Sequence, residues 1–201
     1  GGLDDKSIGS WVEYKKGLID LLLAIGTAVV LCELKDTEIW LPFTKMTITI
    51  PPWLFIPASV VLIWTAINAT NCTDGVDGLS GTLSAIAFTC MGGLLYFALG
   101  HKEIAQYLLL PHYPDGAQWG LMAFSMVGTL IGYLWYNAHP SILLMGDAGS
   151  RAMGFLLGVL VIKSGNPFLI LLVSGVLLIN GGTGLVKVAL LRFTKIAIFR
   201  T

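Results

Sequence analysis

The sequence predicts an all-α polytopic membrane protein, on three observations. Of its 201 residues, 55% are hydrophobic and only 12% are charged, and the mean hydropathy is +0.79. Apolar runs of about 20 residues recur along the chain, which is the length a helix needs to cross a bilayer core. Twelve Lys and Arg residues balance twelve Asp and Glu residues, so neither a nucleic-acid partner nor an acidic disordered tail is expected.

Six candidate transmembrane helices follow one another, separated by polar segments. The polar run GDAGSR at residues 146–151 interrupts the fifth of them. The predicted spans are residues 17–34, 53–70, 79–99, 119–136, 142–162 and 168–190. Residues 1–201 are expected to form a single integral membrane domain. Because the chain begins in a polar segment and ends on a basic one, that domain would be the middle part of a longer helical bundle, incomplete at both ends.

Two segments between the spans carry their own signals. Residues 35–52 alternate β-branched and polar side chains around 46–50 and stop at Pro51 and Pro52, which predicts a short β-hairpin on the outer face. Residues 100–118 carry His101, His112 and Asp115 without metal-ligand spacing, and we expect a solvated outer loop there.

Counting spans also predicts which loops share a side. The side that holds the first residues of the chain carries more Lys and Arg than the other side, and it is therefore expected to be cytoplasmic. The basic residues assigned to that side are Lys6, Lys15, Lys16, Arg151, Arg192, Lys195 and Arg200, and those assigned to the other are Lys35, Lys45, Lys102 and Lys163.

Two pairs of small residues spaced four apart predict close helix packing. They are Gly128 with Gly132 and Gly154 with Gly158. Helices in lipid can approach closely where such residues face each other.

Acidic residues border the spans at positions that all fall on the same predicted face. Asp4 and Asp5 precede the first span, Asp74 and Asp77 follow the second, and Asp147 lies in the polar break of the fifth. Carboxylates beside hydrocarbon are costly, so their convergence needs a reason. A hard divalent cation such as Mg²⁺ binds carboxylate oxygens together with water and substrate phosphate, so the pattern predicts phosphate chemistry. A sixth acid, Asp20, lies inside the first span and is expected to be interfacial.

The run NATNCTDGVDG at residues 68–78 forms the second acidic motif. Its polar residues are three apart, and each such step slips by about 60° on an ideal helix, so the helix must end or bend there. Glycines within the motif permit that change of direction. The polar residues are Asn68, Asn71, Asp74 and Asp77, and the glycines are Gly75 and Gly78.

The run NAHPSILLMGDAGSRAMG at residues 137–154 forms the third motif. Gly146 and Gly149 flank Asp147, which leaves its carboxylate open beside backbone that can approach a phosphate. Ser150 and Arg151 add a hydroxyl and a cation.

At these motifs the chain resembles the polyprenyl-phosphate phosphosugar transferases. The resemblance rests on LDD at 3–5, NATNCTDGVDGLSG at 68–81, YNAHP at 136–140 and MGDAGS at 145–150. The TDG form of the second motif favours the muramoyl-pentapeptide branch of that family.

The resemblance implies a Mg²⁺-dependent phosphoglycosyl transferase of peptidoglycan synthesis, and so a role in cell-wall biogenesis, cell shape and cell division. Its substrates would be UDP-N-acetylmuramoyl-pentapeptide and undecaprenyl phosphate, and its products lipid I and UMP. The enzyme would lie in the bacterial inner membrane with a cytoplasmic active site. The resemblance also allows a homodimer.

The resemblance assigns roles to particular residues. Asp147 would be the metal ligand and a catalytic residue, Asp4 would act on the lipid phosphate, and Asp5 would support it. Whether Asp4 removes a proton or positions the phosphate stays open, because a phosphate monoester is largely deprotonated at neutral pH. The substrate-binding residues would be Asn68, Asn71, Asp74, Gly75, Asp77 and Asn137.

Three other functions are consistent with parts of this pattern. A sister transferase using UDP-N-acetylglucosamine would share the fold and the acids. An ion-coupled transporter would place acids near the midplane of facing helices and often shows internal repeats, which this chain lacks. A structural membrane subunit would not need three acidic motifs on one face.

Overall fold

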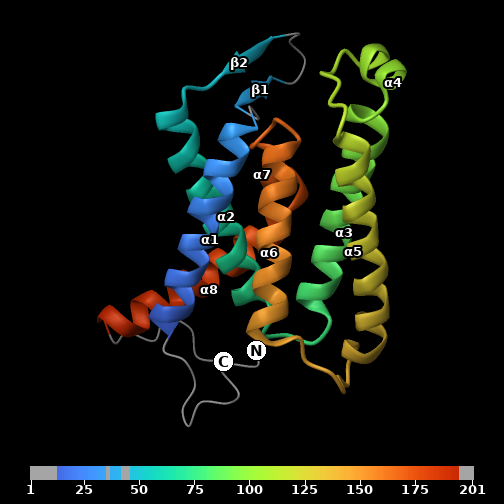
Figure 1. Ribbon diagram of the computed structural model, residues 1–201. Coiled ribbons are helices and arrows are strands. Elements are labelled where there is room, and N and C mark those ends of the chain that lie inside the picture. Colours follow the sequence, from blue (N-terminus) through green and yellow to red (C-terminus); the bar gives the residue numbers. More distant parts are fainter. Residues whose placement is uncertain (1–12, 35–36, 42–45, 195–201) are drawn as a thin grey trace.

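The computed structural model describes residues 13–34, 37–41 and 46–194 and is mostly helical (Figure 1). Asp4 and Asp5 lie outside the described residues. The helices are α1 (Glu13–Glu33), α2 (Pro52–Thr73), α3 (Leu79–Gly93), α4 (Lys102–Tyr107), α5 (Gly116–Asn137), α6 (Gly146–Lys163), α7 (Leu169–Val173) and α8 (Gly175–Thr194). A π-helical turn, η1 (Leu94–Leu99), continues α3, and two strands, β1 (Glu38–Trp40) and β2 (Thr47–Thr49), precede α2.

Helices α1, α2, α3, α5 and α6 run lengthwise side by side, and α8 runs across them (Figure 1). Helix α2 packs against α1, α6 and α8, and α3 packs against α5 (Figure 1). Three helices of the described part of the chain are long and apolar enough to cross a bilayer, judged by length and composition: α2, α3 with η1, and α5. Helix α6 has the length but carries Asp147, Arg151 and Lys163.

The fifth predicted span is wrong at its start. The structure has no helix over residues 142–145, all of which it describes, and α6 begins at Gly146, whose φ of +68° is open to glycine. The run GDAGSR therefore starts the helix and does not interrupt it. An acid in the first turn and a base in the last turn, here Asp147 and Lys163, both suit the helix dipole.

The sixth predicted span is broken in two. Helix α7 ends at Val173 and α8 begins at Gly175, with Ser174 between them at φ −120° and ψ 16°. Helix α8, red in Figure 1, then runs across the bundle and packs against α2. A Cβ on Gly181 would collide with the carbonyl oxygen of Ala69, so the close approach of α8 to α2 requires glycine there.

The predicted hairpin is confirmed. Strands β1 and β2 pair antiparallel with Ile39 opposite Ile48. The indole of Trp40 donates to the Ser164 carbonyl at 2.6 Å, and the Trp40 amide donates to the Gly165 carbonyl at 3.0 Å. These bonds attach the hairpin to the end of α6. The segment 100–118, expected to be a loop, contains the short helix α4 at the same end of the bundle (Figure 1).

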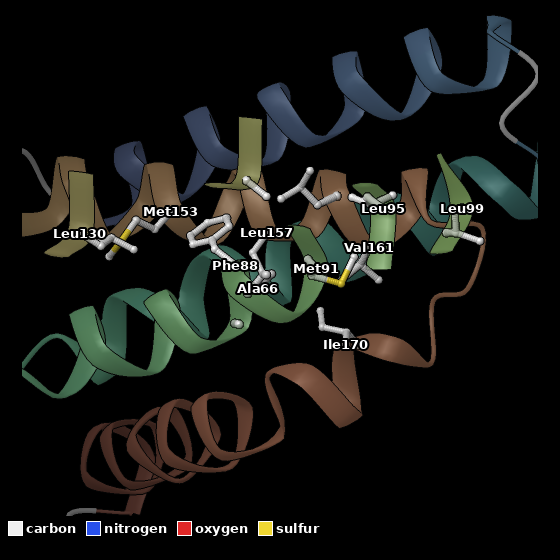
Figure 2. Close-up of a cluster of buried hydrophobic side chains, with 13 residues drawn as sticks. Ala66, Phe88, Met91, Leu95, Leu99, Leu130, Met153, Leu157, Val161 and Ile170 are labelled. Carbon is white, nitrogen blue, oxygen red and sulfur yellow. The ribbon is translucent and has the colours of Figure 1, made fainter. Parts of the chain in front are cut away.

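A continuous apolar core joins α2, α3, α5 and α6. Figure 2 shows Phe88 and Met91 from α3 meeting Leu157 from α6, all of them at most 2% exposed. Burying side chains of this size is worth about 1.5–3 kcal/mol each. The core lies between the two ends of the bundle and so fixes the helix ends that carry the acidic motifs.

The two glycine pairs differ in outcome. A Cβ on Gly154 would lie 2.5 Å from the carbonyl oxygen of Ala66, and one on Gly158 would lie 3.0 Å from the Cα of Ile63. Close packing of α6 on α2 is therefore confirmed. A Cβ on Gly128 or Gly132 would have no atom of the described residues within 4 Å, so close helix packing at that pair stays a prediction.

Candidate active site

Asp147 lies in the first turn of α6, and side chains of two other helices hold its carboxylate. The ammonium of Lys16, on α1, lies 2.6 Å from Oδ2. The amide nitrogen of Asn71, in the last turn of α2, donates to Oδ1 at 3.3 Å and to the Ser150 hydroxyl at 3.0 Å. The Asp147 side chain is 48% exposed, so the carboxylate is anchored and still accessible.

A buried ion pair lies directly behind this carboxylate. The guanidinium of Arg151, one turn along α6, pairs with Asp20 on α1 and also donates to the Asn71 side-chain oxygen at 3.3 Å. Asp20 is only 6% exposed. The Arg151 guanidinium therefore compensates the Asp20 charge inside the helix bundle, and the expectation that Asp20 lies near the membrane interface stays a prediction.

Asp74 follows the last residue of α2 and is close enough to Asp147 to interact with it electrostatically. Burial raises the pKa of the Asp74 carboxyl above its ordinary value, and the negative charge of Asp147 raises that pKa further. Two carboxylates that disfavour each other's charge form a place where a cation would be stabilised.

Asp77 belongs to a second group of contacts at the same end of the bundle. The Ser141 hydroxyl donates to Asp77 Oδ1 at 2.8 Å, and His139 Nδ1 lies 3.4 Å from Oδ2. The hydrogen bond from Ser141 is the main cause of a lowered pKa of the exposed Asp77 carboxyl. Asp77 thus ties the α2–α3 turn to the loop before α6.

Asn137, at the end of α5, joins the same two loops. Its side-chain oxygen accepts from the Gly78 amide at 2.8 Å, and its side-chain nitrogen donates to the Leu143 carbonyl at 2.8 Å. Gly78 has a φ of +73°, which confirms the predicted change of direction after the second motif. The structure gives Asn137 a role in holding the loops, and its predicted contact with substrate stays a prediction.

Two predicted site residues do not join these contacts. The Asn68 amide donates to the Trp64 carbonyl of its own helix at 2.8 Å. A Cβ on Gly75 would have no atom of the described part of the chain within 4 Å. The predicted substrate contacts of these two residues therefore stay predictions, as do the roles of Asp4 and Asp5.

The donor groups at Asp147 fit a hard cation that keeps part of its water shell. Among residues 13–34, 37–41 and 46–194, no three His, Cys, Asp or Glu side chains are placed to share a metal ion. Mg²⁺ often binds through one or two carboxylates and takes its other oxygens from water and substrate phosphates. The Lys16 ammonium already occupies a cation position on Asp147, and Asp74 supplies a second carboxylate nearby.

Sequence reasoning missed Lys16, Asp20 and Ser141 as parts of this region. Ser141 lies within the third motif and four residues after Asn137, so its place near the site could have been inferred from that motif. Asp20 and Lys16 are 131 residues from their partners Arg151 and Asp147. Only the unusual presence of an acid inside an apolar span pointed to Asp20.

The hydrogen bond to Asp77 gives a test by pH. A carboxyl whose pKa is lowered by folding contributes stability above its unfolded pKa, and that contribution is lost as the pH falls through the folded value. We expect Ser141→Ala to raise the pKa of Asp77 toward its ordinary value, followed by ¹³C NMR titration of the carboxyl carbon. Ser125→Ala, which removes a hydroxyl bonded to its own helix, is the control. An unaltered Asp77 pKa in Ser141→Ala would contradict this account.

Comparison with protein-family models places this sequence in a known family. Residues 1–165 match the model of glycosyl transferase family 4. The match covers more than half of the chain and all three acidic motifs, and the chain therefore belongs to that family.

Curated relatives support the same placement. The chain is 55% identical over 201 residues to the phospho-N-acetylmuramoyl-pentapeptide-transferase of Treponema pallidum (strain Nichols), covering 98% of this chain and 55% of the relative. It is 36% identical over 168 residues to the protein of the same name from Maridesulfovibrio salexigens, covering 82% of this chain and 46% of the relative. The Aquifex aeolicus protein of that name is 31% identical over 202 residues, covering 94% and 56%. The chain thus spans about half the length of the curated relatives it matches.

Proposed function

We propose that this protein transfers phospho-N-acetylmuramoyl-pentapeptide from its UDP carrier to undecaprenyl phosphate, giving lipid I and UMP. The observation that carries the proposal is the meeting of Asn71, Asp74 and Asp147 at one end of α2 and α6. Family membership and the names of the relatives support the same reaction. The site would face the cytoplasm from the bacterial inner membrane, in a bundle of six transmembrane segments with the hairpin on the outer face.

The reaction exchanges one phosphoanhydride bond for another. An oxygen of undecaprenyl phosphate attacks the sugar-bearing phosphorus of the UDP substrate, and the bond from that phosphorus to the UMP oxygen breaks. Such a step needs alignment and charge neutralisation more than covalent help from protein. When bound, Mg²⁺ would supply that neutralisation as a Lewis acid on the diphosphate oxygens.

The chain's own residues would divide the remaining work. Asp147 would hold the cation, with Asn71 fixing one of its oxygens, and Asp74 would add a second carboxylate from the end of α2. Lys16, already beside Asp147, supplies positive charge where the diphosphate would lie. Asp4 and Asp5 would act on the lipid phosphate. Besides the two substrates and the bilayer, a second copy of this chain is a candidate partner.

The competing functions lead to different measurements. The position of Asp74, Asp77 and Asp147 at helix ends, and not in mid-span, supports a transferase over an ion-coupled transporter. A sister transferase would release UMP from UDP-N-acetylglucosamine instead of the muramoyl substrate.

Purified protein in detergent tests the proposal. With undecaprenyl phosphate and UDP-N-acetylmuramoyl-pentapeptide, we expect UMP release that stops when EDTA removes divalent cations and returns when Mg²⁺ is restored. UDP-N-acetylglucosamine should release no UMP. Release only from that second donor, or turnover unaffected by EDTA, would contradict the proposal.

A further inference from the structure

Asp20 and Arg151 form a buried charge pair that the proposed reaction does not use directly. Asp20 lies on α1 and Arg151 on α6, and their side chains are 9% and 13% exposed. Removing two charges from water is costly, and buried pairs often add little net stability over apolar side chains of similar size. Stability alone is therefore a weak reason for a charge pair in this position.

A second role for the pair follows from what else the Arg151 guanidinium contacts. One terminal nitrogen pairs with Asp20, while the other donates to the Asn71 side-chain oxygen at 3.3 Å. A guanidinium presents its donors in a rigid fork, so anchoring one nitrogen also fixes the direction of the other. Asp20 thereby orients the donor that Arg151 offers to Asn71.

This contact decides which end of the Asn71 amide faces Asp147. Because the amide oxygen accepts from Arg151, the amide nitrogen points to Asp147 Oδ1 at 3.3 Å and to the Ser150 hydroxyl at 3.0 Å. The reversed amide would place its oxygen against the Asp147 carboxylate, which repels it. The Arg151 contact therefore keeps Asn71 as a donor to Asp147.

We propose that Asp20 and Arg151 are a positioning pair that orients Asn71 and, through it, the carboxylate of Asp147. Asn71 then acts by holding Asp147 and does not offer its oxygen to a metal. The inference rests on the proposed transferase function, because it assigns the pair to the same site.

Paired substitutions separate positioning from simple stability. In Asp20→Leu/Arg151→Leu the two charges of this pair are removed together and replaced by apolar side chains, so the unfolding midpoint should stay near that of the parent. We expect kcat for UMP release to fall by about 10- to 100-fold, as is usual when the group orienting a metal ligand is lost. The KM for the UDP substrate should change little.

Arg151→Lys provides a second, milder variant. A lysine can pair with Asp20 but lacks the fork that also reaches Asn71. We expect it to fold like the parent and to lose kcat in the same range. If the double leucine variant does not fold, Arg151→Lys alone tests the positioning role of the pair.

Metal binding without substrate gives a readout independent of turnover. Mn²⁺ bound in place of Mg²⁺ can be titrated by electron paramagnetic resonance. Its affinity should fall by about tenfold or more in both variants.

The ion pair in the last turn of α6 is the matched control. Lys163, in the last turn, lies 2.6 Å from Asp115 Oδ2 at the opposite end of the bundle. Asp115→Leu/Lys163→Leu should leave both kcat and Mn²⁺ affinity unchanged.

The outcomes are distinct. If the parent protein releases no UMP from the muramoyl substrate, the proposed function fails. If the parent is active but the folded Asp20 and Arg151 variants keep its kcat and Mn²⁺ affinity, the positioning role is overturned.

Discussion

Replacing Asp147 with asparagine is expected to lower the rate of UMP release by about a thousandfold. A Lewis-acid metal contributes several kcal/mol to a transition state, and each 1.36 kcal/mol corresponds to a factor of ten in rate. Asparagine keeps the size of the side chain and can still accept from Asn71, so the fold should persist. The measurement is kcat for UMP release at saturating substrates, together with the thermal unfolding midpoint in detergent.

Glu103→Gln is the matched control for that variant. Glu103 is an exposed acid in the first turn of α4, at the other end of the bundle from Asp147 (Figure 1). The same loss of one negative charge there should leave transfer unchanged. Intact turnover in Asp147→Asn would remove the metal assignment.

Gly154→Ala is expected to destabilise the protein by about 1–3 kcal/mol, the usual cost of overpacking. The added methyl group would meet the carbonyl oxygen of Ala66 at 2.5 Å and the Cα of Ile67 at 2.6 Å. Both are backbone atoms, so α2 and α6 must move apart. Transfer should fall as well, because these two helices carry Asn71 and Asp147. The unfolding midpoint and kcat are measured on the same preparation.

Gly128→Ala makes the identical substitution where space is open. No atom of the residues that the structure describes lies within 4 Å of a Cβ at Gly128, on α5. Alanine is favoured over glycine in a helix by about 1 kcal/mol, so this variant should be as stable as the parent or slightly more so. Equal midpoints for the two alanine variants would contradict the close contact between α2 and α6.

The helices were predictable because hydrophobic runs of span length are local features of the sequence. The predicted span at 79–99 coincides with α3 and η1, and that at 53–70 lies inside α2. The predicted start of the fifth span is wrong because a polar run can begin a helix as well as interrupt one. In the structure Asp147 belongs to the first turn of α6, where exposed backbone amides favour an acid.

The candidate site was predictable only in part, for a physical reason. The motifs indicated that Asn71, Asp74 and Asp147 form one site, because acidic side chains beside hydrocarbon are costly and usually mark a functional site. The contacts of Lys16 and Asp20 depend instead on which faces of α1, α2 and α6 meet. Those faces are set by packing, and in particular by the absence of side chains at Gly154 and Gly158.

The contact between Gly154 and Ala66 also limits how far the two helices can slide past each other. Adjacent residues of a helix differ by about 1.5 Å along its axis, and a shift of one residue would exceed the tolerance of hydrogen bonds near 3 Å. The close contact of the two backbones therefore fixes the position of α6 along α2. The bonds from Asn71 to Asp147 and Ser150 are already formed, so a phosphate-bearing ligand would bind at this site without a shift of α6 along α2.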